Sequence, residues 1–348
     1  MKKCQMHKTI KGTKKQAEAT MRQMISEAEN GGIVCSSVLC LKDWLEQWLK
    51  AYKPNIEDTT RSGYQEKISE YINPKLGHMP LATLQPLTIQ TFFNDLTSQG
   101  LAPKTIRNTF NILNPALKKA VELRMLNYNP CCGVVLPKLV KYQPNIYDTT
   151  QINDVLKKAK GTDMYLIAVL EFSLGIRRGE LCALKWEHVD LENQKVTICE
   201  NRVNDKKGKV ITKSPKSEAG KRVISIGTDV VSVLQKAKDT YIQDKTKLGN
   251  KFQDFGYVVR KRDGTPFQPD SLNQKWRRFL EKNNFPLIRL HDSRHSNATA
   301  LIQSGVSAKV VQQRLGHSDV KLTLDTYTHV LPSMDMEAAN ILNDLMLK

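Results

Sequence analysis

Apolar residues recur at helical spacing through most of the chain and divide it into two predicted units. In the first unit, one helical face collects the apolar positions Leu41, Trp44, Leu45, Trp48 and Leu49. Pro54 must end this helix, and three further helical segments follow over residues 59–72, 88–96 and from 102 onward. Four helices with short connections predict a small all-α domain, with the Trp44/Trp48 pair in its core.

The second unit begins after residues 136–147, which contain two prolines and little periodicity. Residues 164–174 are apolar nearly all round, which predicts a buried helix. Residues 195–203 and 209–212 alternate about a turn and predict a β-hairpin, and residues 222–226 predict a third short strand. The remainder, after Asp229, is mainly helical in pattern. The fold class is therefore mainly α with a small antiparallel β-sheet in the second unit.

Both ends of the chain carry an additional amphipathic helix. The first covers residues 14–30, with Thr13 and Gln16 at the spacing of a capping box. At the other end, Met334, Ala338, Ile341, Leu342 and Leu345 form one apolar face after Pro332. The predicted organisation is an N-terminal basic segment and helix (1–34), a helical domain (35–135), a linker (136–147), a larger domain (148–331) and a tail helix (332–348).

Charge indicates the kind of partner. Lys and Arg number 53 against 35 Asp and Glu, and this formal charge of +18 favours a polyanion such as nucleic acid. No apolar run is long enough for a membrane helix, and we expect no membrane association. The seven cysteines form no C-x-x-C pair, which favours reduced thiols in a cytoplasmic protein.

Several common sites have no sequence support. The chain contains no G-x-G-x-x-G, no P-loop and no G-x-S-x-G. His291 and His295 have the i, i+4 spacing of a zinc pair, but Asp292 stands where the zincin motif has Glu, and Arg294 adds a cation. We therefore expect no metal and no cofactor.

Four short blocks of the second unit combine cations, histidines and a tyrosine. They read GIRRGEL with Arg177, LHDSRH with His291 and Arg294, LGHS with His317, and TLDTYTH with Tyr327. Each block has a purely structural explanation when it is taken alone: a surface salt bridge, a shared helix face, a helix C-cap or a packed aromatic ring. Their order and combination require another explanation.

Together these blocks resemble the tyrosine recombinase (phage integrase) family, and are closest to integrases of bacterial conjugative transposons and temperate phages. The family's lysine corresponds to Lys216 in SPKSEAGKRVISI, with Lys213 as the alternative. The resemblance covers about residues 38–331. It implies an all-α core-binding domain followed by a mixed α/β catalytic domain, and a site-specific recombinase that cuts and rejoins DNA through a 3′-phosphotyrosine.

The resemblance also implies a role for each motif residue. Arg177 and Arg294 would donate hydrogen bonds to the non-bridging oxygens of the scissile phosphate, and His317 would add a third contact. Tyr327 would be the nucleophile. His291 would be its base and Lys216 the acid that protonates the leaving 5′ oxygen. Glu180 would steady Arg177, whereas His295 and His329 would pack or hold backbone.

The implied partner is double-stranded DNA at attachment sites, bound by a homo-tetramer that exchanges its C-terminal tails. Excisionase or DNA-bending accessory proteins, and a location at the bacterial nucleoid, also follow from the resemblance. As DNA contacts we select four basic residues outside the catalytic set: Arg61, Lys104, Arg107 and Arg178.

Two departures from the family pattern leave questions open. Ser225 stands where the family's strand usually ends in proline, and only the trailing helix of an N-terminal arm-binding module is present. The alternatives are a chromosome-dimer resolving recombinase and a catalytically inactive DNA-binding regulator. The filled catalytic positions argue against the regulator, and the helix at residues 14–30 argues against the resolvase.

Overall fold

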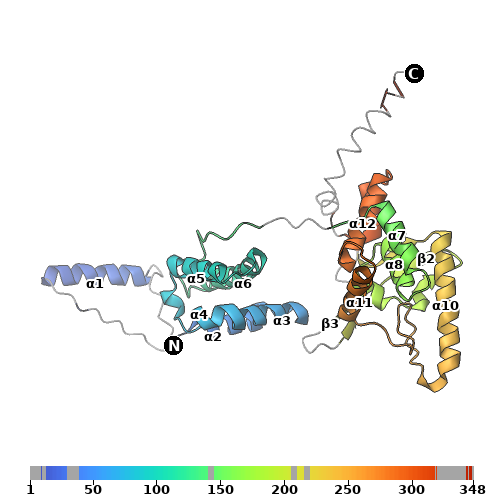
Figure 1. The fold of residues 1–348 in the computed structure, drawn as a ribbon. Helices are drawn as coiled ribbons and strands as arrows, with labels where there is room; N and C mark the ends of the chain where they lie inside the picture. Colours follow the sequence, from blue (N-terminus) through green and yellow to red (C-terminus); the bar gives the residue numbers. More distant parts are fainter. Residues whose placement is uncertain are drawn as a thin grey trace. The chain divides into compact units, whose positions relative to one another are not determined.

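The structure, a computed structural model, describes residues 9, 13–29, 39–139, 145–204, 210–214, 220–317, 319, 342–343 and 345–346. The chain separates into two compact units, Met1–Tyr142 and Gln143–Lys348 (Figure 1). Each unit has its own hydrophobic core. None of the helices in the described part of the chain combines the length and the apolar character that a membrane crossing requires.

The first unit is all helical over the residues described. Its helices are α1 (Lys14–Glu29), α2 (Leu41–Tyr52), α3 (Asp58–Lys67), α4 (Asn73–Leu76), α5 (Pro86–Ser98) and α6 (Pro103–Glu122). A π-helical turn, Ile68–Ile72, joins α3 to α4, and a 3-10 turn, Leu81–Thr83, precedes α5. Trp44 and Trp48 are each 2% exposed, which confirms that the pair belongs to the core. The Trp44 indole N–H donates to Ala116 O at 3.0 Å and so ties α2 to α6.

The second unit packs helices around α8. Its helices are α7 (Thr149–Ala159), α8 (Met164–Leu174), α9 (Arg178–Ala183), α10 (Thr228–Leu248), α11 (Pro269–Lys282), α12 (Leu290–Gln303) and α13 (Ala308–Leu315), with 3-10 turns at Trp186–His188 and Gly249–Lys251. α8 contacts α7, α10 and α12, which explains why its sequence is apolar on almost every side (Figure 1). Within α8, Glu171 is a buried exception.

The strands form two small antiparallel sheets. One has the order β1-β2-β5, from Val189–Asp190, Lys195–Ile198 and Arg222–Ser225, and the other pairs β3 (Asn201–Asn204) with β4 (Val210–Lys213). The prediction of one continuous strand over residues 195–203 was wrong, because the chain changes sheets after Ile198. Val196 and Ile198 face the core in the first sheet, whereas β3 leaves it to pack against α9. The mainly helical class with small antiparallel sheets is confirmed.

Candidate active site

The corner between α8 and α9 fixes the position of Arg177. α8 ends at Gly175, whose φ of 60° lies in the left-handed region. A Cβ atom there would come within 2.6 Å of Asn297 Oδ1, so the corner needs glycine for space as well as for its backbone angles. Arg177 follows in extended conformation and immediately precedes the first turn of α9. Arg177 therefore lies at a sharp, closely packed turn of the backbone.

The Arg177 guanidinium is held by two partners. Nη1 donates to Glu180 Oε1 at 2.7 Å, and Nη2 donates to Gly316 O, just after α13, at 2.9 Å. The Arg177 backbone N–H also donates to Glu180 Oε2, at 2.9 Å. The side chain is nevertheless 38% exposed. Because a guanidinium has five N–H groups, Arg177 is held in place and can still donate toward solvent.

Glu180 is a buried carboxylate shared by two arginines. Its side chain is 2% exposed, and Arg222 of β5, which is 6% exposed, donates to its Oε2 at 2.8 Å. Burial by itself would raise the pKa of Glu180, but the hydrogen bond and charge of Arg222, together with those of Arg177, outweigh burial and lower the pKa below its usual value. Glu180 is thus ionised. Sequence reasoning missed Arg222, whose only signal is a cation at the start of the apolar strand RVISI.

Arg294 joins three helices. Arg294 belongs to α12 and is 2% exposed to solvent. Its Nη1 donates to Gly175 O at the end of α8, at 2.8 Å, and its Nη2 donates to Leu315 O at the end of α13, at 2.7 Å. Arg294 and Arg177 therefore bond to two consecutive carbonyls, those of Leu315 and Gly316. Two arginines from different helices converge on one helix terminus.

His317 follows that terminus directly. Gly316 ends α13 with a φ of 68°, and the His317 backbone is then held by Gln312, which accepts from its N–H at 3.1 Å and donates from Nε2 to its carbonyl at 2.9 Å. Burial, followed by the charges of Arg294 and Arg177, lowers the pKa of His317 to about 4. The imidazole is therefore neutral at pH 7 and can donate one N–H.

His291 lies in the first turn of α12, three residues before Arg294. Although the residue is exposed, burial of part of its ring, followed by His295 and Arg294, lowers its pKa to about 4. The centroids of the His291 and His295 rings are 5.4 Å apart. A neutral imidazole has a lone pair, so His291 can accept a hydrogen bond near neutral pH.

α12 begins in an unusual way. Arg289 occupies the N-cap position, where a side-chain acceptor such as Ser or Asp is normally preferred. Instead, the buried Asp292 accepts from the Arg289 backbone N–H at 2.9 Å, from its Nε at 3.1 Å and from its Nη2 at 2.9 Å. The Arg289 side chain remains 62% exposed. This arrangement places a further cation beside His291, and sequence reasoning missed it.

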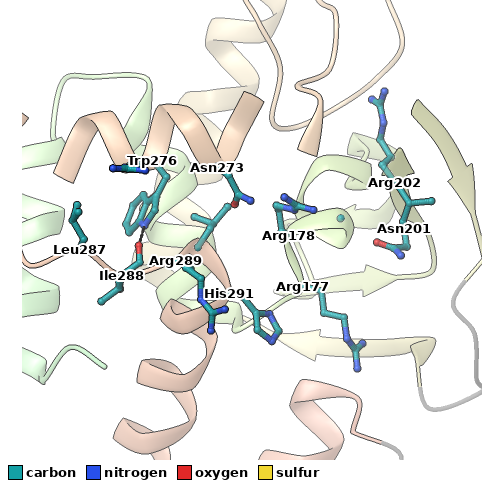
Figure 2. A pocket seen from close by; sticks show the side chains of 14 residues that line it. Arg177, Arg178, Asn201, Arg202, Asn273, Trp276, Leu287, Ile288, Arg289 and His291 are labelled. Atoms are coloured by element: carbon teal, nitrogen blue, oxygen red, sulfur yellow. Dashed lines mark hydrogen bonds between the residues drawn. The ribbon is translucent and has the colours of Figure 1, made fainter. Parts of the chain in front are cut away.

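Arg177, His291 and Arg289 line one cleft of about 840 Å³ (Figure 2). Its cationic lining consists of Arg177, Arg178, Arg202, Arg277 and Arg289, and the neutral His291 also lines it. Its floor is largely apolar and includes Trp276, whose indole N–H donates to Ile288 O at 3.0 Å. Arg178, on the α9 side, forms an ion pair of 2.9 Å with Asp270 of α11. The arginines come from four separate segments, so the cleft is positively charged from several sides.

The selected DNA contacts differ in their surroundings. Arg61 donates to the carbonyls of Leu49, Lys53 and Pro54, where it closes the C-terminal end of α2. Arg107 Nε donates to Pro137 O at 3.1 Å, and Lys104 is exposed. Of the four, Arg178 lines the cleft described above.

The structure brings three of the six predicted catalytic residues together at the end of α13, namely Arg177, Arg294 and His317. A fourth, His291, lies three residues before Arg294 and lines the same cleft as Arg177. Lys216 and Tyr327 lie outside the described residues. The alternative lysine, Lys213, ends β4 opposite Asn201 of β3, and Asn201 lines the cleft. His329 and most of the predicted tail also lie outside the described residues, although Leu342 and Leu345 are described and are exposed.

No group of three or more metal-ligating side chains occurs among the residues that the structure describes. His291 and His295 thus have no third ligand of this kind nearby within that part of the chain. The polar groups of the site are mainly cations and neutral imidazoles, an arrangement suited to an anionic ligand.

Comparisons with known proteins identify related chains. A model of the phage integrase family matches residues 146–334, and a model of the N-terminal SAM-like domain of phage integrases matches residues 40–97. A tyrosine recombinase XerC-like protein of Caldanaerobacter subterraneus subsp. tengcongensis is 29% identical, with 96% of this chain and 90% of that protein covered. The ICEBs1 integrase of Bacillus subtilis is 25% identical, with 86% and 82% covered.

Two solved structures show the same fold. The integrase of the transposon Tn1549, in complex with transposon right end DNA, superposes with a TM-score of 0.75 at 19% identity, covering 89% of this chain and all of that chain. A lambda integrase dimer bound to a COC' core site gives a TM-score of 0.61 at 18% identity, covering 83% and 95%.

Proposed function

The chain belongs to the phage integrase family and is a tyrosine-type site-specific recombinase, and from this premise we propose how its residues carry the reaction. The proposed catalytic centre combines two arginines, two histidines, a lysine and a tyrosine. These are Arg177, Arg294, His291, His317, Lys216 and Tyr327. The observation that carries the proposal is the convergence of Arg177 and Arg294 on the consecutive carbonyls of Gly316 and Leu315, directly before His317.

The cationic part of the site suits a phosphodiester at the point of cleavage. Attack on phosphorus increases the negative charge on the non-bridging oxygens, and the two arginines stay charged at any usable pH. Their anchoring to Glu180, Gly175 and the end of α13 holds them before the substrate arrives. A preorganised donor of this kind lowers the barrier by roughly 3–4 kcal/mol. His317 would add one neutral N–H donor.

The covalent step proceeds by transesterification. The Tyr327 oxygen attacks phosphorus while His291 takes the phenolic proton. The bond from phosphorus to the 5′ oxygen breaks, and that oxygen receives a proton from Lys216. In the second step, the 5′ hydroxyl of a partner strand attacks the phosphotyrosine and releases Tyr327. The number of phosphodiester bonds is conserved, so the scheme requires no external energy source.

The substrate is double-stranded DNA, and the cleft provides its cationic surface in the second unit. We propose that residues 35–135 act as a core-binding domain, that residues 148–331 act as the catalytic domain and that residues 136–147 link them. The two family models and the two separate hydrophobic cores support this division. We propose that the reaction serves integration and excision of a mobile element, and the integrases among the relatives support the integration. Its place would be the bacterial cytoplasm, at the nucleoid.

We also propose that the active assembly is a homo-tetramer on two duplexes, biased by accessory proteins such as an excisionase. Residues 332–348 would dock on a neighbouring protomer. The exposed apolar side chains of Leu342, Leu345 and Met346 support this part of the proposal, because an amphipathic helix needs an apolar partner.

Tyr327→Phe tests the nucleophile. With a nicked DNA substrate, the wild type should accumulate a covalent protein–DNA complex, whereas Tyr327→Phe should bind the same DNA and form no complex. Tyr241→Phe is the matched control, because the Tyr241 hydroxyl donates to Asp254, and burial together with that carboxylate raises its pKa to about 12. If Tyr327→Phe still formed the covalent complex and Tyr241→Phe did not, Tyr327 would not be the nucleophile.

A further inference from the structure

Glu171 is a buried titratable residue that the scheme above does not use. It lies where α8 packs against α12, and three side chains of α12 bond to α8 there. Ser293 Oγ donates to Glu171 Oε2 at 3.0 Å, Arg294 Nη1 donates to Gly175 O at 2.8 Å, and Asn297 Nδ2 donates to Phe172 O at 2.6 Å. Glu171 thus belongs to the same contact as Arg294. Among these contacts it is the one titratable carboxyl.

The surroundings of Glu171 favour its neutral form. The residue is fully buried, and its Oε1 is enclosed without a hydrogen-bond partner among the described residues. An ionised carboxylate needs partners for both oxygens, and leaving a buried one unsatisfied is costly. Glu180 differs, because its two oxygens accept from two arginines.

Neighbouring groups act on Glu171 in opposite directions. Burial raises its pKa, the Ser293 hydroxyl and the Arg294 charge lower it, and the Glu180 charge on α9 raises it, with a result of about 8. Cys182 of α9 also interacts with Glu171, but burial raises the thiol pKa to about 12, so this thiol stays neutral. At pH 7, Glu171 carries a proton.

We propose that Glu171 is a positioning residue for DNA cleavage, which stays protonated in the DNA-bound state and so leaves the charge of Arg294 to the scissile phosphate. An ionised Glu171 would place a negative charge behind Arg294 and weaken its attraction for the phosphate. By the same interaction, a bound phosphate opposes ionisation of Glu171. The inference rests on the proposed role of Arg294.

Glu171→Gln tests the inference, because glutamine keeps the shape of the side chain and cannot ionise. The measurement is the second-order rate of covalent complex formation at low DNA concentration, from about pH 6.5 to about pH 9.5, since this rate reports the groups of the free enzyme. The readout is the ratio of the variant's rate to the wild-type rate. Every other titrating group, including Tyr327 and the histidines, is common to both proteins and cancels.

The ratio should be constant below about pH 7 and should rise once Glu171 ionises in the wild type, by at most about tenfold per pH unit, until it levels off at the activity that the ionised form retains. Glu192→Gln, an exposed carboxylate in the turn after β1, is the matched control and should give a flat ratio. A flat ratio for Glu171→Gln over the whole range would overturn the inference. A wild type that forms no covalent complex would instead contradict the proposed function.

A second measurement uses only the wild-type protein and decides the case if Glu171→Gln does not fold. Calorimetry of DNA binding at about pH 8, in buffers of different ionisation enthalpy, gives the number of protons taken up. The protein should take up more protons when it binds intact DNA than when it binds DNA with a neutral methylphosphonate at the scissile position. His291 and His317 would contribute mainly at acidic pH, because their pKa values are lowered to about 4. Equal uptake with both DNAs would overturn the inference.

Discussion

The inner corner of the site and the outer wall of its cleft use arginine in opposite ways. The inner corner consists of Arg177 and Arg222, which share the carboxylate of Glu180, and of Arg294, which bonds to the main-chain carbonyls of Gly175 and Leu315. The outer wall carries Arg277 of α11 and Arg289 before α12, whose side chains are 71% and 62% exposed. Both regions are cationic, and Arg289 also bonds to a buried partner, Asp292, whereas Arg277 pairs with the exposed carboxylate of Glu281.

This difference suggests separate roles, with the inner corner suited to catalysis and the outer wall suited to the initial binding of DNA. A donor fixed before the substrate arrives needs no reorganisation in the transition state, so the inner corner is suited to stabilising charge that develops on phosphorus. Glu180, Arg222 and Arg294 are desolvated, and their stability depends on complete pairing. Arg277 stays hydrated and can adapt to a DNA backbone, and its exposed ion pair with Glu281 contributes little to folding.

Glu180→Gln should have the largest effect, because it leaves Arg222 and Arg177 without their shared carboxylate. Loss of one partner in a buried ion pair costs about 3–5 kcal/mol, so the free energy of unfolding should fall by that amount in denaturant titrations. Covalent complex formation should fall about a hundredfold, since Arg177 loses the carboxylate that is one of its two anchors. Glu281→Gln is the matched control on the outer wall, where the carboxylate is 44% exposed and pairs with Arg277 at 2.8 Å. A loss below about 1 kcal/mol in Glu180→Gln would show that the inner corner is not held by this carboxylate.

Sequence reasoning found the parts of the inner corner that depend on local spacing. His291 and Arg294 share a helix face because they are three residues apart, and the glycines at 175 and 316 marked two helix ends correctly. It did not find the partner Arg222, which is 42 positions from Glu180 and meets it only through tertiary packing. The protonated state of Glu171 likewise depends on burial between helices.

The wrong prediction of one continuous strand over residues 195–203 has the same origin, because the true strand pairing also depends on tertiary packing. Residues 195–203 alternate like one strand, but the alternation cannot show that the chain changes partners. β3 packs so closely on α9 that a Cβ atom at Gly179 would lie 2.6 Å from Arg202 O. This approach depends on α9, a segment about twenty residues earlier, and the strand's own residues carry no sign of it.

Gly175→Ala should move the inner corner without changing any charge. Alanine would be strained at a φ of 60°, and its Cβ would meet Asn297 Oδ1 at 2.6 Å and Leu315 Cδ2 at 2.8 Å. We expect a loss of about 3 kcal/mol in the free energy of unfolding, from backbone strain and overpacking together. The rate of cleavage should fall by about tenfold, because Gly175 O accepts from Arg294.

Gly161→Ala is the control for Gly175→Ala. Its φ is 79°, but nothing lies within 4 Å of the added Cβ, so it tests backbone strain alone. A loss of about 1 kcal/mol and an unchanged cleavage rate are expected for Gly161→Ala. If the two variants lose the same stability and the same activity, the close packing at Gly175 has no role in the site.

Arg277→Ala should have the smallest effect, and one restricted to DNA binding. Arg277 lines the cleft, and its ion pair within the described part of the chain is with an exposed carboxylate, so the free energy of unfolding should change by less than about 0.5 kcal/mol. The Kd for DNA should rise several-fold, which corresponds to about 1 kcal/mol of binding free energy. The magnitude of the slope of log K against log salt concentration should fall by about 1, as expected for one lost phosphate contact. Arg262→Ala provides the comparison, because Arg262 is 88% exposed and does not line the cleft. An equal change of slope in both variants would mean that the outer wall attracts DNA through net charge alone. An unchanged slope in Arg277→Ala would show that this arginine does not contact the DNA.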